Sequence, residues 1–409
     1  MQFDCCVIGA GIVGLATALK LLQGEPRLKI LIVEKETSVA AHQTGHNSGV
    51  VHSGVYYRPD SLKARLCRDG SAEIKQFCAQ YDVPLDTIGK LIVATNGVEL
   101  ERLSALMQRA QANGIAAERL DSQELSRVEP NIVGVGALKI ASAAITDYAA
   151  ICKKMLELLI ARGAEIRFGA EVISIAERHD GVTVALASQD SAVASQLVVC
   201  AGLQSDRLAR MAGLAVDIRI VPFKGEYYRL PIERSSLVRH LIYPVPDPRL
   251  PFLGVHLTRH VDGTTTVGPN AVLSLAREGY GRHGFAAADA RDILSFPGFW
   301  RLAAANFRSG ANEMAMSLSR RHYLKAIQKY CPSLTLDDLE TYSSGIRAQA
   351  VDVNGKMIED FTFVRSARTF HVLNAPSPAA TAALPIGRMI AEATGLIPDG
   401  ANAYLRASS

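Results

Sequence analysis

The chain has 409 residues, of which 48% are hydrophobic and 21% are charged, and its formal net charge is +4. This composition excludes a disordered protein and allows a core large enough for two interleaved domains. The Lys and Arg residues are spread along the chain and form no basic run, so we expect no nucleic-acid partner. The seven cysteines lack the paired spacing of zinc or redox motifs, which predicts reduced thiols in a cytoplasmic protein without a metal site.

The first residues predict neither a signal peptide nor a membrane span. Residues 1–4 carry no positive charge, whereas a signal peptide begins with a basic region. The apolar run from Cys5 to Leu19 is too short to cross a bilayer, and glycines interrupt it.

The amino-terminal segment has the pattern of a dinucleotide-binding unit, because a short strand, a glycine turn and a helix follow one another in residues 3–22. The turn contains Gly9, Gly11 and Gly14 in the order G-x-G-x-x-G. The first glycine permits the tight bend, the second admits a pyrophosphate, and the third lets the helix pack on the strand. A second strand ends in Glu34, about 20 residues further on, where a carboxylate accepts hydrogen bonds from ribose hydroxyls. An acid at this position disfavours a 2′-phosphate, which leaves FAD or NAD as the cofactor.

Later segments favour FAD. Residues 163–186 alternate apolar and polar side chains around a His-Asp-Gly turn, which predicts a β-hairpin. A buried strand then runs into a second glycine joint at Ala201 and Gly202. This order resembles the large FAD-dependent oxidoreductases of the D-amino-acid-oxidase type. The resemblance implies that the second joint closes over the same flavin and that the backbone of Val172 lies against the adenine. A second, independent parallel unit is the alternative.

The sequence shows no boundary between two independent units, since no linker rich in Pro or Ser is present. We therefore expect an α/β fold with a discontinuous, Rossmann-like FAD-binding domain, and we assign it residues 1–90, 148–215 and 342–409. Residues 91–147 and 216–341 contain many strand-like pieces. They are expected to form a substrate or capping domain with a mixed or antiparallel β-sheet.

Residues 294–330 are predicted to be helical. Phe296, Phe299, Trp300 and Phe307 lie near the start of this segment, and several Arg and Lys residues follow. A basic amphipathic helix of this kind can lie on an anionic membrane. The alternative, which the spacing favours, is a surface helix whose aromatic side chains face the core.

Blocks from one end of the chain to the other resemble the L-2-hydroxyglutarate dehydrogenase family, whose members are also described as L-2-hydroxyglutarate oxidases. Many oxidoreductases share the glycine motif, whereas the blocks around His46 and NAPSPAAT are far more restrictive. One segment departs from the family pattern, because ASAAITDY keeps Asp147 and Tyr148 but lacks the histidine-containing run that usually precedes them. The blocks that carry the resemblance are HNSGVVHSGVYYRPDSLKARLC, PFKGEYYRL, GVHLT, GPNA, FPGFWR, SGIRAQ and NAPSPAAT.

The resemblance implies oxidation of L-2-hydroxyglutarate to 2-oxoglutarate, with hydride transfer to flavin N5 and electrons passed to a quinone or another acceptor. This reaction needs a base for the hydroxyl proton, and histidine suits that role near neutral pH. We expect His256, on a probable strand that faces the flavin ring, to be the base, with His52 as the second candidate. A structural role for either histidine is the alternative.

A dicarboxylate substrate requires cations or clustered donors in its pocket. Arg347 can clamp a carboxylate through two hydrogen bonds, or it can contact the flavin or form a buried ion pair. Lys224 is expected near the edge of the flavin ring, where a cation favours the reduced, anionic flavin. A solvated lysine at a strand end is the alternative for Lys224. Tyr57 and His52 are expected to line the same pocket.

Two segments are expected to cradle the flavin. Residues 45–59 closely follow the ribose-binding strand, and their glycines leave room for the backbone to approach the cofactor. Residues 374–381 predict a proline turn before a helix, whose backbone N–H groups would reach the flavin edge that becomes negative on reduction. A plain turn is the alternative. The other residues predicted to bind the cofactor are Lys35, Thr44, His46, Asn47, Ser48, Gly345, Arg347, Pro376, Ser377, Ala379, Ala380 and Thr381.

The family resemblance also argues for noncovalent FAD, in a cytoplasmic enzyme that has peripheral contact with the inner face of the cell membrane. Two other functions stay open at this point. One is an oxidase of the same fold that acts on amines such as sarcosine or glycine, or on glycerol 3-phosphate. The other is a non-catalytic flavoprotein subunit, which would leave the His and Arg candidates without a role.

Overall fold

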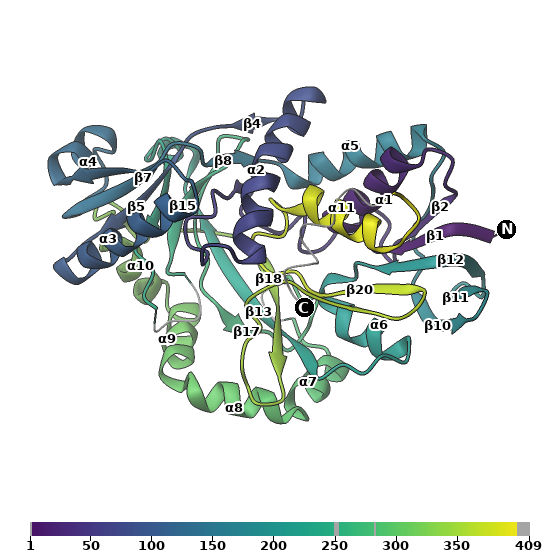
Figure 1. Cartoon of the computed structure of the whole chain (residues 1–409). Helices are drawn as coiled ribbons and strands as arrows, with labels where there is room; N and C mark the ends of the chain where they lie inside the picture. Colours follow the sequence, from purple (N-terminus) through teal and green to yellow (C-terminus); the bar gives the residue numbers. More distant parts are fainter. Residues whose placement is uncertain (1, 249–252, 282–283, 399–409) are drawn as a thin grey trace.

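The amino-terminal strand lies inside the first of two large sheets (Figure 1). A computed structural model describes residues 2–248, 253–281 and 284–398. Strand β1 pairs in parallel with β12 on one side and with β2 on the other, and β20 pairs in parallel with the end of β12. The interior of β1 and all of β2 are buried and apolar, as expected for parallel strands covered on both faces. The strands of this sheet are β1 (Gln2–Ile8), β2 (Ile30–Val33), β9 (Glu165–Arg167), β10 (Val172–Arg178), β11 (Gly181–Leu186), β12 (Ser191–Val199), β19 (Thr362–Arg365) and β20 (Thr369–Asn374).

Helices α1, α5 and α11, from distant parts of the chain, pack together above this sheet in Figure 1, and their buried residues belong to one hydrophobic cluster. Helix α11 crosses α1 so closely that a Cβ atom on Gly387 would lie 2.6 Å from the backbone of Ala16. The carboxy-terminal segment is therefore held against the nucleotide-binding unit. The helices of this region are α1 (Ile12–Gly24), α2 (Leu62–Gln80), α5 (Tyr148–Ala161), α6 (Ser205–Met211) and α11 (Ala383–Ala393).

The hairpin predicted within residues 163–186 is present as β10 and β11, which are antiparallel and joined at His179 and Asp180. The strand predicted before Ala201 is β12, and a short 3-10 helix, η1 (Gly202–Gln204), follows it directly. Both local predictions are therefore confirmed. Each could be made from the sequence because its pattern lies within a few consecutive residues.

The second sheet is mixed. Its strands β14 and β5 pair in parallel, whereas the other strand pairs of this sheet, such as β13 with β18 and β5 with β7, are antiparallel. The predicted α/β class with a mixed second sheet is therefore confirmed. The longest strand of this sheet, β18, lies in the range predicted for the FAD-binding domain and pairs along its length with β13. The domain limits stay a prediction, and residues 399–409 lie outside the described part. The strands are β5 (Lys90–Ala94), β6 (Glu118–Asp121), β7 (Gly136–Ile140), β13 (Ile218–Arg229), β14 (Leu241–Pro244), β15 (His256–Arg259), β16 (Thr265–Gly268), β17 (Val272–Leu273) and β18 (Glu340–Asp352).

Smaller elements complete the structure around the second sheet. A three-stranded sheet of β3 (Val50–Val51), β8 (Ala144–Thr146) and β4 (Leu85–Asp86) forms next to the segment predicted to cradle the flavin. Figure 1 shows α3 and α4 at one end of the second sheet and α8 and α9 along its lower edge. The remaining helices are α3 (Gly97–Ala112), α4 (Ser122–Val128), η2 (Ile232–Arg234), α7 (Ala287–Leu294), α8 (Pro297–Ala305), α9 (Phe307–Leu318) and α10 (Arg320–Gln328).

The helical prediction for residues 294–330 is confirmed as three consecutive helices rather than one. Phe296 and Phe299 are buried, as expected for aromatic side chains that face the core. Trp300 and Phe307, in contrast, are 56% and 74% exposed. Across the described ranges, no helix combines the length and the apolar character that a bilayer crossing requires.

Candidate active site

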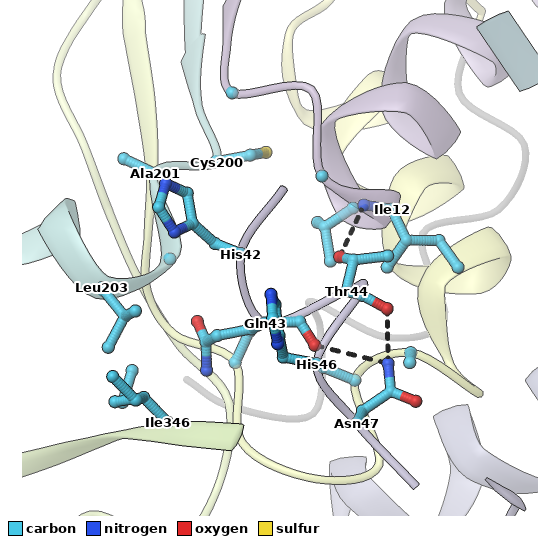
Figure 2. A pocket seen from close by; sticks show the side chains of 18 of the residues that line it. Ile12, His42, Gln43, Thr44, His46, Asn47, Cys200, Ala201, Leu203 and Ile346 are labelled. Atoms are coloured by element: carbon cyan, nitrogen blue, oxygen red, sulfur yellow. Dashed lines mark hydrogen bonds between the residues drawn. The ribbon is translucent and has the colours of Figure 1, made fainter. Parts of the chain in front are cut away.

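A cavity of about 820 Å³ lies between the two sheets and takes residues from both. Its volume is in the upper part of the range for ligand sites, about 300–1,000 Å³. Figure 2 shows the loop of residues 42–47 at the cavity wall, opposite Ala201, Leu203 and Ile346. The predicted residues that line the cavity are Gly9, Gly11, Glu34, Lys35, Thr44, His46, Asn47, Ser48, His52, Val172, Ala201, Gly202, Gly345, Arg347, Ser377, Ala379, Ala380 and Thr381.

The nucleotide end of the cavity is formed by the turn after β1. A Cβ atom on Gly14 would lie 2.0 Å from the carbonyl oxygen of Gly9, so helix and strand touch there, and Gly14 itself does not line the cavity. The carboxylate of Glu34 accepts hydrogen bonds from the N–H groups of Ala10 at 2.8 Å and Glu36 at 3.0 Å. These bonds fix the carboxylate at the cavity wall while leaving acceptor positions for hydroxyl groups.

The amino terminus of α1 opens onto the cavity, and its own N-cap residue has no side chain to cap it. Its N-cap is Gly11, and its first turn contains no acidic residue. The hydroxyl of Thr44 accepts a hydrogen bond from the N–H of Ile12 at 3.2 Å (Figure 2). The other N–H groups of the first turn, together with the positive end of the helix dipole, form the kind of site that binds phosphate.

The loop after Thr44 is held by its own side chains. The amide of Asn47 donates to the carbonyl oxygen of Thr44 at 2.6 Å and accepts from the N–H of Gly49 at 2.8 Å. The His46 ring stacks on Tyr280 with 4.0 Å between ring centres, and burial lowers the pKa of His46. Asn47 therefore shapes the loop as well as facing the cavity.

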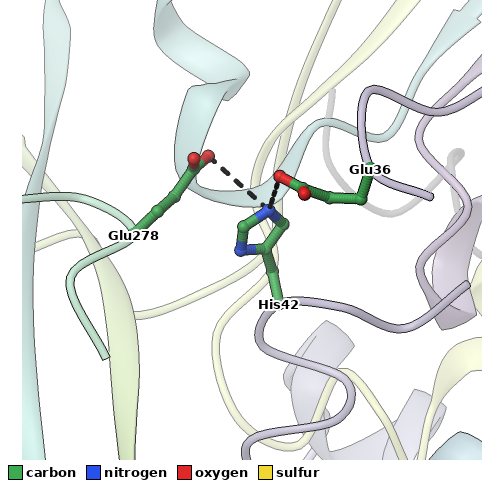
Figure 3. Close-up of side chains that lie close together, drawn as sticks. All are labelled: Glu36, His42 and Glu278. Carbon is green, nitrogen blue, oxygen red and sulfur yellow. Dashed lines mark hydrogen bonds and ion pairs between the residues drawn. The ribbon is translucent and has the colours of Figure 1, made fainter. Parts of the chain in front are cut away.

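A charged cluster lines part of the nucleotide end of the cavity. Ligand-type atoms of Glu36, His42 and Glu278 lie within 4.8 Å of one another (Figure 3). The ammonium of Lys35 pairs with Glu278 at 2.8 Å and also with Glu36. Because Lys35 already supplies the positive charge between the two carboxylates, the cluster acts as a link between the nucleotide-binding unit and the segment after β17. Gln204 strengthens that link through a 2.8 Å hydrogen bond to Glu278.

The segment before α11 lines the far end of the cavity. The hydroxyl of Thr381 accepts a hydrogen bond from the N–H of His52 at 3.1 Å and lies 3.0 Å from the hydroxyl of Tyr148. Pro376 is not part of the lining, and its carbonyl oxygen accepts a hydrogen bond from Ala379. These bonds join the two segments that were predicted to cradle the flavin, although they are more than 300 residues apart.

His256, the expected base, is not among the residues that line the cavity, although it lies within electrostatic range of His52 and Arg347, which are. It is 5% exposed, and its ring stacks on Tyr243 with 4.0 Å between ring centres. Its Nδ1 is 3.0 Å from the carbonyl oxygen of Gly254, which can only accept, so Nδ1 carries the proton and Nε2 keeps its lone pair. Burial lowers the pKa of His256 to about 3, with a smaller contribution from the cations Lys90 and Arg347.

His52 lines the cavity itself and is surrounded by positive charge. Burial lowers its pKa well below the ordinary value, and Lys90, His256 and Lys63 act in the same direction. Tyr57 does not line the cavity but forms a side-chain hydrogen bond with Ser377, which does. Two neutral imidazoles therefore lie within electrostatic range of each other at this end.

Arg347 and Lys224 point to different faces of the second sheet. Arg347 is opposite Phe223 in the pairing of β13 with β18, and both line the cavity. Arg347 keeps accessible surface, and burial lowers its pKa. Side chains alternate along a strand, so Lys224 faces the other way, and its ammonium donates to the carbonyl oxygen of Gly281 at 2.9 Å. The geometry does not support the predicted position of Lys224 at the cavity.

Sequence reasoning missed residues in the cavity wall and a cluster next to His256 that is not part of the wall. Lys90, Tyr243 and Tyr56 pack together, with the ammonium of Lys90 4.0 Å from the ring centre of Tyr243 and 5.3 Å from that of Tyr56. Tyr148 and Tyr227 line the cavity. One signal in the sequence could have singled out Lys90: it is a lysine directly before LIVA, an apolar run that is typical of a buried strand.

Comparison with known proteins places these features in a family. Residues 4–393 match the model of the family described as FAD dependent oxidoreductase. The chain is 48% identical to L-2-hydroxyglutarate dehydrogenase of Escherichia coli strain K12 over 389 residues, which cover 95% of this chain and 92% of the relative. The chain belongs to the L-2-hydroxyglutarate dehydrogenase family of FAD-dependent oxidoreductases. The human member, named L-2-hydroxyglutarate dehydrogenase, mitochondrial, is 41% identical over 408 residues, which cover 96% of this chain and 88% of the relative.

Solved structures agree with this membership. L-alpha-glycerophosphate oxidase from Mycoplasma pneumoniae, with FAD bound, superposes with a TM-score of 0.76 at 25% identity over 95% of this chain and 93% of that chain. Glycine oxidase from Geobacillus kaustophilus superposes with a TM-score of 0.73 at 15% identity over 98% and 96% of the two chains and shares the fold. The predicted family, fold and enzyme class are thereby confirmed, and FAD rather than NAD is the cofactor.

The cavity fits FAD on its own chemistry. It is long enough to include the start of α1 for the diphosphate, the carboxylate of Glu34 for a ribose, and the segment before α11 at the opposite end. The lining combines polar groups at the nucleotide end with small residues such as Ala379 and Ala380 at the other.

Proposed function

We propose that the protein oxidises L-2-hydroxyglutarate to 2-oxoglutarate with FAD. The observation that carries the proposal is that a guanidinium, Arg347, lines the FAD cavity and lies within electrostatic range of a neutral imidazole, His256. The names of relatives at 48% and 41% identity support the choice of substrate. Removal of a hydroxyl proton and a hydride from one carbon needs a base and a bound carboxylate beside the flavin.

In the proposed reaction, Arg347 clamps the carboxylate next to the reacting carbon, and Nε2 of His256 takes the hydroxyl proton. When bound, FAD supplies the two-electron acceptor for the hydride that leaves the same carbon. The hydrogen bond to Gly254 keeps the His256 ring in the tautomer that can accept a proton. His52 is the second candidate for the base, and Tyr57 orders the pocket through Ser377.

The charge around His256 suits a substrate that brings negative charge. In the free enzyme, burial and nearby cations keep the imidazole unprotonated. A bound dianion partly neutralises those cations and raises the pKa of the imidazole, which makes it a stronger base in the complex. The same cations stabilise the negative charge that develops on the substrate oxygen.

The test is a comparison of initial rates with a dye acceptor. L-2-Hydroxyglutarate should give the highest kcat/KM in a panel with glycerol 3-phosphate, glycine and sarcosine, whereas a clear preference for one of the others would contradict the proposal. The structural similarity to a glycerophosphate oxidase makes glycerol 3-phosphate the most informative competitor in the panel.

The FAD is proposed to be noncovalent. Burial raises the pKa of two thiols to about 12: that of Cys200, which lines the cavity, and that of Cys67, which donates a hydrogen bond to the carbonyl oxygen of His52. A thiol that stays protonated is a poor nucleophile for attachment to the flavin. After acid precipitation the flavin should remain in the supernatant, and flavin in the pellet would contradict this proposal.

We also propose a cytoplasmic enzyme that contacts the membrane peripherally and passes electrons to a quinone. Support comes from the exposed surface of α8 and α9, where Trp300, Phe307 and Leu318 are 56%, 74% and 81% exposed and lie on helices that also carry the exposed Arg301 and Arg308. Aromatic and basic side chains together favour binding to anionic lipid. A Phe307→Ser variant should co-float less with vesicles that contain anionic lipid, and unchanged flotation would contradict the membrane contact.

A further inference from the structure

Three neighbouring strands of the second sheet present one polar residue each on the same face. In the parallel pairing of β5 with β14, Lys90 is opposite Leu241, two residues before Tyr243. In the antiparallel pairing of β14 with β15, Ile242 is opposite Leu257, so Tyr243 and His256 emerge together on the other face. The register therefore brings Lys90, Tyr243 and His256 to the same face of the sheet, where Tyr243 packs in one hydrophobic cluster with Val50 and Val55.

Lys90 and His256 occupy opposite faces of one phenol ring. The ammonium of Lys90 is 4.0 Å from the ring centre of Tyr243, and the imidazole of His256 stacks on the same ring at 4.0 Å. Two groups at that distance cannot share a face. The expected base and the ammonium therefore lie on the two sides of one buried aromatic ring.

Lys90 is a buried cation without a counter-charge in the protein. It is 1% exposed, and within residues 2–248, 253–281 and 284–398 no carboxylate forms an ion pair with it. Its contacts are with the faces of Tyr243 and Tyr56, which compensate only part of the cost of burying an ammonium. Burial lowers the pKa of Lys90 to about 8.

A second polar group beside Lys90 also lacks a partner. The hydroxyl of Tyr56 is buried and makes no hydrogen bond among the described residues. Buried polar groups in native proteins are nearly always hydrogen-bonded, so an unsatisfied donor beside an uncompensated ammonium points to a ligand that supplies acceptors. A carboxylate has two acceptor oxygens and a negative charge, which matches both groups.

Lys90, Tyr56, Tyr243 and His256 are not part of the cavity lining, but two lining residues connect them to it. His52, in the lining, lies within electrostatic range of both Lys90 and His256, and His256 lies within range of Arg347, also in the lining. A substrate with one carboxylate on Arg347 and its hydroxyl on His256 would direct the rest of its chain toward Lys90.

We propose that Lys90, assisted by the hydroxyl of Tyr56, binds the distal carboxylate of the substrate and makes the enzyme specific for dicarboxylates. This inference rests on the proposed function, since only a dicarboxylate has a second carboxylate to place there. The two cations then have different tasks. Arg347 binds the carboxylate next to the reacting carbon, and Lys90 selects substrates that have a second carboxylate at the right distance.

The competing role for Lys90 is purely electrostatic. Its positive charge contributes to the low pKa of His256, so loss of Lys90 could alter the base without any contact with substrate. That role would affect every substrate equally, whereas a contact with the distal carboxylate affects only molecules that possess one.

The experiment uses the FAD-loaded protein and two pairs of probes. Binding of glutarate and of pentanoate is measured from the change in flavin absorption, and kcat/KM is measured for L-2-hydroxyglutarate and L-2-hydroxypentanoate. We expect Lys90→Met to weaken glutarate binding by about 100-fold, as for removal of one partner of a buried charge pair, and to leave pentanoate binding unchanged. Lys90→Arg should recover part of the loss, and Lys90→Gln provides a second neutral variant.

Lys20→Met is the matched control. Lys20 is a partly buried lysine on α1 that pairs with Glu73, and Glu73 keeps a second ion pair with Arg388. This variant should bind both probes as the native protein does. Equal weakening of glutarate and pentanoate by Lys90→Met, or no weakening of either, would overturn the inference. If native protein binds glutarate through Lys90 but L-2-hydroxyglutarate does not reduce its flavin, the proposed function fails while the assignment of Lys90 stands.

Discussion

The two ends of the cavity are built in different ways. At the nucleotide end the backbone does most of the shaping, because Gly9, Gly14 and the open start of α1 lie within a few residues of one another. Toward the other end, the side chains that matter come from β5, β14, β15 and β18 of one sheet. These strands are far apart in sequence, as the numbers of Lys90 and Arg347 show. One end therefore depends on close backbone approach, which tolerates almost no substitution. The other depends on charge placed by sheet register, which a substitution can change without unfolding the protein.

The largest expected effect is at the backbone end. Gly14→Val should abolish both folding and FAD content, because a Cβ atom there would lie 2.0 Å from the carbonyl oxygen of Gly9. Gly310→Ala is the matched control, since it is also a helical glycine but has no atom within 4 Å of the added carbon. The control should fold and gain up to about 1 kcal/mol of stability. Yield and the ratio of flavin to protein measure both effects, and a folded yellow Gly14→Val protein would break the comparison.

The next effect concerns the base at the side-chain end. His256→Gln should lower kcat by about 10²–10⁴-fold, the usual contribution of a general base, with little change in FAD content. His52→Gln is the parallel variant. We expect a smaller loss from it, because the hydrogen bond to Gly254 holds His256 in the tautomer that can accept a proton. Rates of flavin reduction in rapid mixing give the values. A larger loss in His52→Gln would transfer the role of base to His52.

A moderate effect is expected at the ribose position. Glu34→Gln keeps the shape of the side chain but removes the charge that strengthens its hydrogen bonds, so FAD affinity should fall by about 10-fold. Glu25→Gln, just beyond the other end of α1, should retain the native affinity. Fluorescence titration of deflavinated protein with FAD measures both. An unchanged affinity in Glu34→Gln would show that the carboxylate only braces the turn through Ala10.

The smallest effect is on acid stability. Burial holds the pKa of His256 at about 3 in the folded protein, below the value of about 6.5 in an unfolded chain. The unfolded state therefore binds more protons, and stability is lost as the pH falls from about 6.5 toward 3. His256→Gln should flatten this slope by at most one proton, or about 1.4 kcal/mol per pH unit. Urea midpoints between pH 7 and pH 5, with the exposed His179→Gln as control, measure it, and an unchanged slope would contradict the low pKa.

The nucleotide end was predictable because its motif is local. The spacing of Gly9, Gly11 and Gly14 and the acid at Glu34 are visible in consecutive residues, and the structure places them around one turn. The hairpin of β10 and β11 was predictable for the same reason.

The substrate end was predictable only in part. Lys90 meets Tyr243 through the pairing of β5 with β14, and side-chain periodicity does not reveal which strands pair. The position of Lys224 was expected from similar enzymes, and the sequence does not reveal the phase of β13, which places Phe223 rather than Lys224 in the cavity lining. Arg347 was found because its sequence block is restrictive in the family, which bypasses the question of register.

Single-turnover reduction of the flavin tests the central claim most directly. The FAD-loaded protein is mixed without oxygen with an excess of L-2-hydroxyglutarate, and the yellow absorption of oxidised flavin and the amount of 2-oxoglutarate are followed together. We predict complete loss of the yellow colour and one 2-oxoglutarate formed for each flavin reduced. A flavin that stays oxidised with L-2-hydroxyglutarate but is reduced by glycerol 3-phosphate or glycine would contradict the account.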